Sequence, residues 1–108
     1  MGKQTLQHFE LHVLLAMLRE RGETYSVPLV VALEKRMERR VAQAAVFIAL
    51  GRLERKGLVT SRLDERDGAR SRRYFRVTSR GLAAIKENRL EHERLWRGLG
   101  RVLSVPKA

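Results

Sequence analysis

Hydrophobic residues recur at helical spacing over several stretches of the chain and alternate with polar residues over two shorter ones. The clearest helical pattern is VAQAAVFIALGRLERKGLV, residues 41 to 59. Within it Val46, Leu50 and Leu53 stand at i, i+4 and i+7, which predicts one buried face of a helix. Two small residues widen this face, Ala45 and Ala49. Gly57 predicts the end of the helix. The opposite face carries Gln43, Phe47, Arg52, Arg55 and Lys56.

Two earlier stretches also predict helices. Apolar residues lie on two sides of a helix over residues 5 to 21, which predicts a helix wedged between packing partners and ended by Gly22. A second helix is predicted over residues 24 to 38, with a buried face formed by Val30, Leu33 and Met37. A short turn with Arg39 and Arg40 leads into the third helix. Such a helix-turn-helix places its second helix in the DNA major groove.

Two strands are predicted after Gly57, over residues 58 to 63 and 73 to 78, because Phe75 and Val77 alternate there with polar residues. Between them, Asp67-Gly68 is a hairpin turn signal. Basic residues crowd this region: Arg62, Arg66, Arg70, Arg72, Arg73, Arg76 and Arg80. An arginine-rich hairpin beside a helix-turn-helix is interpreted as a wing that contacts phosphates or the minor groove. The alternative is a solvated, charged loop.

A long final helix is predicted over residues 79 to 103, with Thr78 as its cap. Its heptad-like seam has a polar centre and consists of Leu82, Ile85, Arg89, His92, Trp96, Leu99 and Leu103. A small domain cannot bury the outer half of such a helix, so we expect a second copy to cover it in a two-fold homodimer. Trp96 anchors this interface or, with His92, walls a pocket for a small aromatic effector.

Composition then limits the class of protein. The 108 residues predict one compact unit, with a winged helix-turn-helix over residues 1 to 78 and a dimerisation helix and tail over residues 79 to 108. The net charge of +11 predicts a polyanionic partner, most often nucleic acid, and a merely soluble basic surface is the alternative. Cysteines are absent, which excludes disulfides. No signal peptide or membrane span is apparent, so we expect a cytoplasmic protein.

Candidate catalytic and metal chemistry is sparse. His8 and His12 share a helical face at a metal-ligand spacing, but no third ligand is near in sequence and Glu10 is expected to point elsewhere. Solvated or interface histidines are therefore the preferred interpretation. The sequence has no Gly-rich phosphate loop and no nucleophile beside a histidine by motif. We expect neither an enzyme nor a bound metal or cofactor.

Three segments taken together resemble the PadR family of transcriptional regulators, in its short form with a single C-terminal helix. They are FELHVLLAMLRERGETYSVPLVVALE, VFIALGRLERKGLV and RSRRYFRVTSRGLAAI, in order and at family spacing over most of residues 9 to 85. The resemblance implies a mainly α (α+β) winged helix-turn-helix and a homodimer crossed through its terminal helices. It also implies repression at a palindromic operator, with a small, often aromatic effector bound between the subunits in some relatives.

The sequence departs from the family pattern at positions expected to face DNA. Relatives usually have Tyr-Gly where this chain has Tyr25-Ser26, and Ser, Gly and Tyr where it has Ala42, Ala44 and Phe47. Ala42 lacks the hydroxyl that would cap the recognition helix. Phe47 lacks a hydroxyl that relatives are thought to direct at the DNA backbone, so phosphate binding would depend more on arginines.

We therefore expect sequence-specific binding to double-stranded DNA. Gln43, Phe47 and Arg52 would meet the major groove or its edges, Arg39 and Arg40 the backbone, and the wing arginines further phosphates. The complete expected contact set is Tyr25, Arg39, Arg40, Gln43, Phe47, Arg52, Arg66, Arg70, Arg72 and Arg73. Two other functions stay open. An RNA-binding winged helix is favoured by the basic charge alone, and a module that binds only proteins is favoured by the missing Ser and Tyr hydroxyls.

Overall fold

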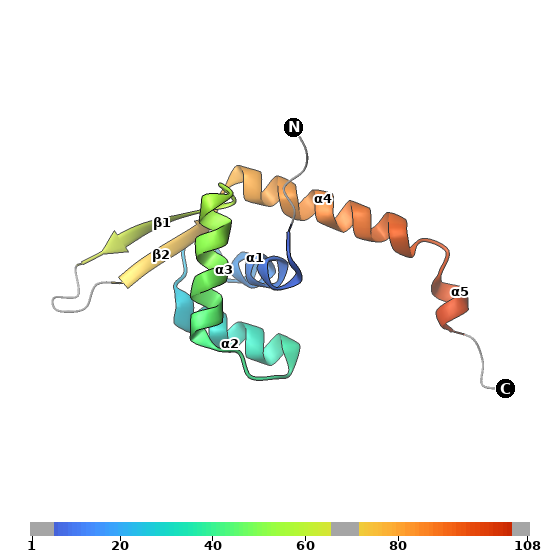
Figure 1. The fold of residues 1–108 in the computed structure, drawn as a ribbon, viewed down its shortest axis with the longest axis horizontal. Coiled ribbons are helices and arrows are strands. Elements are labelled where there is room, and N and C mark those ends of the chain that lie inside the picture. Colours follow the sequence, from blue (N-terminus) through green and yellow to red (C-terminus); the bar gives the residue numbers. More distant parts are fainter. Residues whose placement is uncertain (1–5, 66–71, 105–108) are drawn as a thin grey trace.

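A computed structural model of the chain describes residues 6–65 and 72–104. Within these residues, three helices are followed by an antiparallel hairpin and two further helices (Figure 1). The elements are α1 (His8–Arg19), α2 (Ser26–Met37), α3 (Gln43–Arg55), β1 (Val59–Asp64), β2 (Arg72–Val77), α4 (Ser79–Trp96) and α5 (Gly100–Leu103). This order confirms the predicted fold class, a mainly helical winged helix-turn-helix with a long C-terminal helix.

The core lies between α1, α2 and α3, and the base of the hairpin closes it. Val46, Leu50 and Leu53 are fully buried, which confirms the predicted inner face of α3. The buried face of α2 is only partly as predicted, because Leu29 and Leu33 fill the core while Val30 and Met37 pack at its margin. On its outer side, α1 presents apolar side chains that the described residues leave partly exposed. Its exposed apolar side chains are Leu15 and Leu18.

The hairpin pairs Val59 with Val77 at its base and Asp64 with Arg72 at its far end. The observed strands lie within one residue of the predicted bounds, and Phe75 is buried as the alternating pattern predicted. Thr24 pairs with Phe75 of β2 on the edge of β2 that faces away from β1. Its backbone N–H lies 3.0 Å from the Phe75 carbonyl oxygen, and its carbonyl oxygen lies 2.7 Å from the Phe75 nitrogen. The predicted turn Asp67-Gly68 lies outside the described residues.

Several predicted helix ends are confirmed. The Thr78 hydroxyl accepts a hydrogen bond from the Gly81 N–H at 3.0 Å and so caps α4. Gly57 follows the C-cap of α3 with φ +78°. Ala42 is the N-cap of α3 and gives it no side-chain hydrogen bond. The Glu34 carboxylate accepts a hydrogen bond from the Val41 N–H at 3.0 Å, which holds the turn just before α3.

The prediction of one continuous helix from residue 79 to 103 is wrong. The chain leaves the helix at Arg97, whose ψ is 129°, and Gly98 then adopts φ +85°, a conformation that glycine permits without steric cost. Leu99 is the N-cap of the short α5, on which Leu103 lies. The seam predicted for dimerisation is therefore continuous only from Leu82 to Trp96.

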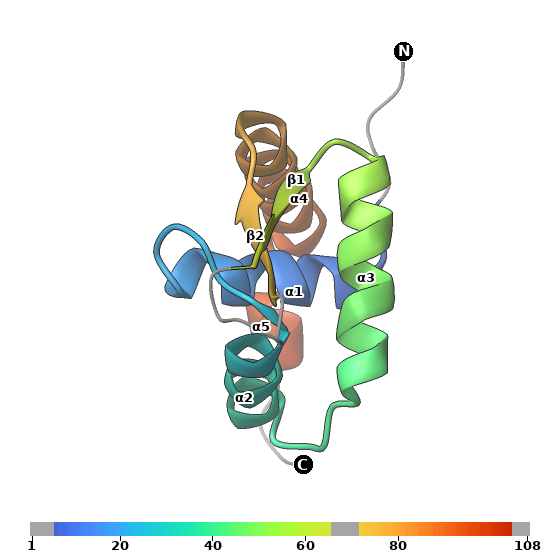
Figure 2. The same ribbon diagram turned by 90° about the vertical axis from the view of Figure 1, so that its left-hand side faces the viewer.

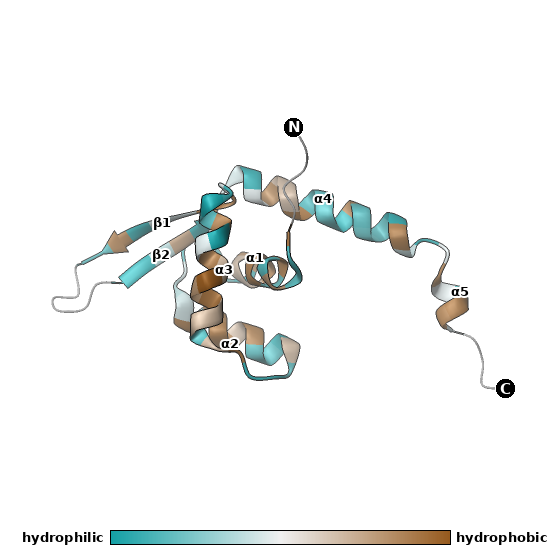
Figure 3. Cartoon of the chain, in the orientation of Figure 1, coloured by the Kyte–Doolittle hydropathy of each residue, from teal (hydrophilic) through white to brown (hydrophobic). Residues whose placement is uncertain are grey.

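The long helix α4 starts at the base of the hairpin, packs on α1 and β2 over its first turns, and then extends away from the body (Figure 1). Figure 3 shows that its surface is mostly hydrophilic, with separate hydrophobic bands. Every residue of α4 from Arg89 onward is exposed. Among the described residues, no helix is sufficiently long and apolar to cross a membrane.

Candidate nucleic-acid interface

The N-terminal half of α3 presents an open face beside α2 and the hairpin, as Figure 2 shows. Phe47 is 48% exposed and Ile48 is 56% exposed, which is unusual for large apolar side chains on a helix that also forms the core. Ala44 on the same face is exposed too. The sequence pattern indicated Phe47 but missed Ile48. An isoleucine beside Ala49, which is buried, is more typical of the core than of a binding surface.

The N-terminal ends of α2 and α3 lie together at this face. The Gln43 side-chain amide donates to the Ser26 hydroxyl at 2.9 Å, and both residues open their helices. Helix N-termini carry partial positive charge, so two of them side by side favour an anion such as a phosphate. Arg39 and Arg40 lie exposed in the turn just before α3. Gln43 is thus held in place by α2, and its amide is not entirely free for a base.

At the other end of α3, basic side chains bind α1. The guanidinium of Arg52 donates to the Gln7 side-chain oxygen at 3.2 Å, and the ammonium of Lys56 lies 2.6 Å from the Glu10 carboxylate. Glu10 is only 2% exposed and points to Lys56 on α3. It does not line the cavity that His8 and His12 line, which agrees with the expectation that it points away from these histidines. Arg52 was predicted to meet the major groove. It is exposed, but its observed contact is within the protein.

The protonation state of Glu10 follows from these contacts. Burial raises the pKa of the Glu10 carboxyl, whereas hydrogen bonds from Lys56 and the Gln7 N–H, together with nearby positive charge, lower it. The net effect is a pKa below the ordinary value of 4.5. Glu10 is therefore a carboxylate at neutral pH. Its second oxygen, Oε2, is buried without a hydrogen-bond partner.

The far end of the described hairpin brings two of the predicted contact residues, Tyr25 and Arg72, together. The Arg72 guanidinium lies 4.1 Å from the centre of the Tyr25 ring. Arg73 is on the opposite face of β2 and donates to the Ser61 hydroxyl at 3.1 Å. Arg66 and Arg70, which were predicted to contact DNA from the tip of the wing, lie outside the described residues.

The predicted dimer seam and effector site are on α4, away from the wing. Trp96 is 52% exposed, and its indole stacks on the His92 ring with centroids 5.4 Å apart and planes 25° apart. Arg89 pairs with Glu93 on its own helix at 3.1 Å. Ile85 packs partly against the core of its own chain, whereas Leu82 is exposed.

A cavity of about 350 Å³ lies between α1 and α4. The three histidines of the chain, His8, His12 and His92, all line it, together with Glu91. Trp96 is not among its lining residues, so the predicted effector pair His92 and Trp96 is split between the cavity and the outer surface. Within residues 6–65 and 72–104, no cluster of three or more potential ligands can hold a metal ion.

Comparison with known proteins identifies the family to which this arrangement corresponds. The profile of the Transcriptional regulator PadR-like family matches residues 14–87, which is more than half of the chain. A search of curated proteins found no match.

Similar solved structures include PadR-type regulators from three bacteria. The first is a PadR family transcriptional regulator from Eggerthella lenta, 26% identical, with a TM-score of 0.70 over 91% of this chain and 89% of that one. A PadR-like transcription factor from Bacteroides fragilis is 17% identical, with a TM-score of 0.74 over 87% and 88% of the two chains. A PadR family regulator from Clostridium difficile is 18% identical, with a TM-score of 0.69 over 91% and 100%.

The family match covers the second half of α1, all of α2, α3 and both strands, and the first half of α4. These elements include the open face of α3 and the wing. The winged-helix geometry and the basic charge agree with it. This chain therefore belongs to the PadR-like family, and it is a DNA-binding transcriptional regulator.

Proposed function

We propose that the protein is a homodimeric repressor that binds a palindromic operator through α3 and the wing and is released by a small aromatic effector. The observation that carries this proposal is the open face of α3, on which Phe47 is 48% exposed and Ile48 is 56% exposed. Exposed apolar residues there cost solvation free energy unless a partner covers them. A major groove rich in thymine methyl groups provides such a partner.

Base recognition would then be largely apolar. Ala44, Phe47 and Ile48 have no hydrogen-bonding side-chain atoms, so they can distinguish bases mainly by contact with the thymine methyl. Gln43 is the polar residue on this face, and its bond to Ser26 fixes its position. Arg39, Arg40, Arg72 and Arg73, and the wing-tip residues Arg66 and Arg70, would contact phosphates and fix the register. We infer an operator half-site containing thymines.

A second copy would supply the other half-site. Two apolar side chains on the expected seam of α4 are exposed in the described part of the chain, Leu82 at 43% and Trp96 at 52%. Pairing of α4 with its symmetry mate would bury them and place two recognition helices one helical turn of DNA apart, roughly 34–36 Å. The seam expected for this contact runs through Leu82, Ile85, Arg89, His92 and Trp96 and no longer includes Leu99 and Leu103.

The effector would bind where α4 meets α1. The cavity there is bounded by the helix that pairs the two copies, so a ligand in it changes the angle between α4 and the winged helix. Release from DNA follows if the effector binds one dimer geometry more tightly than the other. The His92 ring and the nearby Trp96 provide aromatic surface for a planar ligand.

Selection of bound duplexes from a random library tests the function. Each thymine of the selected sequence is then replaced with uracil, which removes only the methyl group. We expect an inverted repeat. At contacted positions each lost methyl should weaken binding about three- to fivefold, because one methyl is worth about 0.8 kcal/mol. Phe47→Ala should abolish this uracil effect at the thymines that Phe47 contacts. Leu15→Ala, at an exposed apolar residue of α1, serves as the control. Selection without a repeat, or no loss on uracil replacement, would contradict the proposal.

A further inference from the structure

The segment before α2 lies along β2 as a one-residue strand, and this places its side chains on the wing. The bridge between Thr24 and Phe75 is antiparallel, and side chains alternate between the faces of a strand. Thr24 is buried with Phe75 on the core side. Glu23 and Tyr25, one residue to each side of Thr24, therefore share the outer face of the wing with the side chains of Arg62, Arg72, Tyr74 and Arg76.

Glu23 occupies the centre of this basic face. The Arg62 guanidinium donates two hydrogen bonds to the Glu23 carboxylate, from Nε and from Nη2, each 2.7 Å long. Arg76 lies 4.0 Å from the same carboxylate. Asp64 adds a second acid at 3.5 Å from Arg62. The hydrogen bonds from Arg62 are the main cause that lowers the pKa of Glu23 below its ordinary value, so Glu23 is ionised at neutral pH.

Aromatic rings continue this cluster towards α2. The Arg62 guanidinium lies 5.1 Å from the centre of the Tyr74 ring, and Tyr74 meets the Tyr25 ring edge-on at 5.7 Å. The Arg72 guanidinium lies over the Tyr25 ring, 4.1 Å from its centre. The cation–π contact with Tyr74 and the bidentate ion pair with Glu23 therefore both hold Arg62 against the protein. Its neighbours Arg72 and Arg73 are among the residues proposed to contact phosphates.

We propose that Glu23 is an internal competitor for DNA phosphate. It holds the Arg62 guanidinium and attracts Arg76, and so withdraws positive charge from the wing at the place where a DNA backbone would be bound. Phosphate contacts are independent of sequence, whereas base contacts are not. Withholding a phosphate-binding arginine lowers affinity for all DNA alike, so discrimination depends more on α3. Glu23 thereby acts as a determinant of specificity, an inference that rests on the proposed use of the wing.

The test compares Glu23→Gln, Arg62→Gln and the double variant on a duplex of random sequence at several salt concentrations. Glu23→Gln keeps the shape and removes the charge. We expect it to raise affinity several-fold and to steepen the slope of log K against log salt by about one per protomer, because one more phosphate is neutralised. Arg62→Gln alone should leave affinity within twofold of wild type. The gain should vanish in the double variant.

The matched control is Glu93→Gln, which removes an equal charge from the exposed Arg89–Glu93 pair on α4. It should not change the salt slope. If Glu23→Gln leaves affinity and slope unchanged or lowers them, or if Arg62→Gln weakens binding as strongly as Arg73→Gln does, the inference is overturned. Absence of salt-dependent binding in the wild-type protein would instead contradict the proposed use of the wing itself.

Discussion

Lys56 Nζ lies 2.6 Å from Glu10 Oε1, and this ion pair joins the C-terminal end of α3 to the first turn of α1. The Glu10 side chain is almost fully buried, whereas that of Lys56 is 26% exposed. The Gln7 N–H also donates to the Glu10 carboxylate, at 3.0 Å. A single carboxylate therefore caps one helix and holds the recognition helix against it.

Glu10→Gln tests this link. The amide keeps the shape but removes the charge that binds Lys56, and a weakened buried hydrogen-bond site costs about 1–3 kcal/mol. We expect the free energy of unfolding in urea to fall by that amount. Glu93→Gln is the control, because an exposed helical pair contributes only about 0.3–0.5 kcal/mol.

The same pair predicts a pH dependence. The pKa of Glu10 in the folded protein is below its ordinary value of 4.5, so its contribution is complete above that pH and is lost as the pH falls through the folded pKa. The difference in unfolding free energy between wild type and Glu10→Gln should hence be constant near pH 7 and shrink below about pH 4.5. A difference that grows towards acid pH would show that Glu10 is not stabilised as a carboxylate.

Ala42→Ser should stabilise the recognition helix. Ala42 is the N-cap of α3 with φ −73° and ψ 134°, an extended conformation in which a serine hydroxyl can accept an N–H of the first turn. We expect about 0.5–2 kcal/mol of added stability, measured by thermal or urea unfolding. Ala44→Ser, inside the helix, is the control and should be neutral or slightly destabilising. Equal effects at both positions would exclude capping as the cause.

Gly81→Ala should weaken the attachment of α4. A Cβ at Gly81 would overlap the Leu58 carbonyl oxygen and lie 2.7 Å from Val77 Cγ1. We expect a loss of at least about 1–3 kcal/mol, because the backbone must move to relieve the overlap. Gly51→Ala in α3 is the matched control. Its Cβ would meet only Arg55 Nη1, at 3.7 Å, so the better helix propensity of alanine should stabilise the protein by about 0.5–1 kcal/mol.

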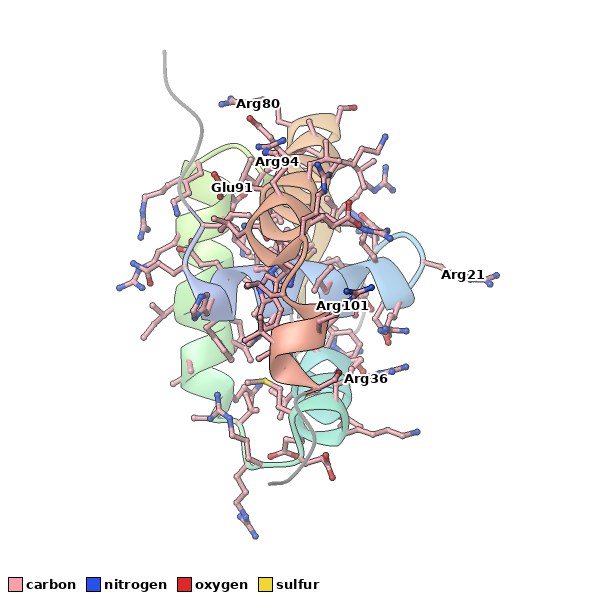
Figure 4. All side chains as sticks on the ribbon, turned by 90° about the vertical axis from the view of Figure 1, so that its right-hand side faces the viewer. Arg21, Arg36, Arg80, Glu91, Arg94 and Arg101 are labelled. Atoms are coloured by element: carbon pink, nitrogen blue, oxygen red, sulfur yellow. The ribbon has the colours of Figure 1, made fainter. Side chains whose placement is uncertain are left out.

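The proposed dimer predicts a specific effect at Trp96. Trp96→Ala removes a half-exposed indole from each copy, and truncation of an interface tryptophan typically costs 2 kcal/mol or more. By symmetry the two copies together lose about 4 kcal/mol, so the dimer dissociation constant should rise about 10³-fold, which sedimentation measures. Arg94→Ala is the control, because Arg94 lies on the same helix (Figure 4) but two residues from both His92 and Trp96, outside the spacing of three and four that defines the seam. If the dissociation constant of the Trp96→Ala dimer is unchanged, or if the wild-type protein is a monomer, Trp96 does not lie in a dimer interface.

Periodicity was sufficient to predict the elements and most of the core, because Val46, Leu50 and Leu53 repeat at helical spacing and Phe75 stands in an alternating strand. It failed at the end of α4. The heptad-like pattern continues through Leu99 and Leu103, but Gly98 adopts a positive φ that ends the helix before them.

Contacts between distant residues could not be predicted from one sequence. Glu10 and Lys56 are 46 residues apart, and nothing local distinguishes Glu10 from a solvated glutamate. Glu23 and Arg62 are 39 residues apart, and their pairing depends on the bridge between Thr24 and Phe75. The candidate DNA surface was predicted in outline, from the resemblance and the arginines, but the engagement of Gln43 by Ser26 and of Arg52 by Gln7 required the fold.

The salt dependence of binding to duplex DNA tests the central claim most directly. If α3, the turn before it and the two wings of a dimer neutralise roughly 6–10 phosphates, affinity should fall by about 10³–10⁵ between 50 and 200 mM salt. The measurement is a titration of labelled duplex, with structured RNA of equal length in parallel. The account predicts this steep loss and tighter binding to DNA. A nearly flat salt response, or tighter binding to the RNA, would contradict it.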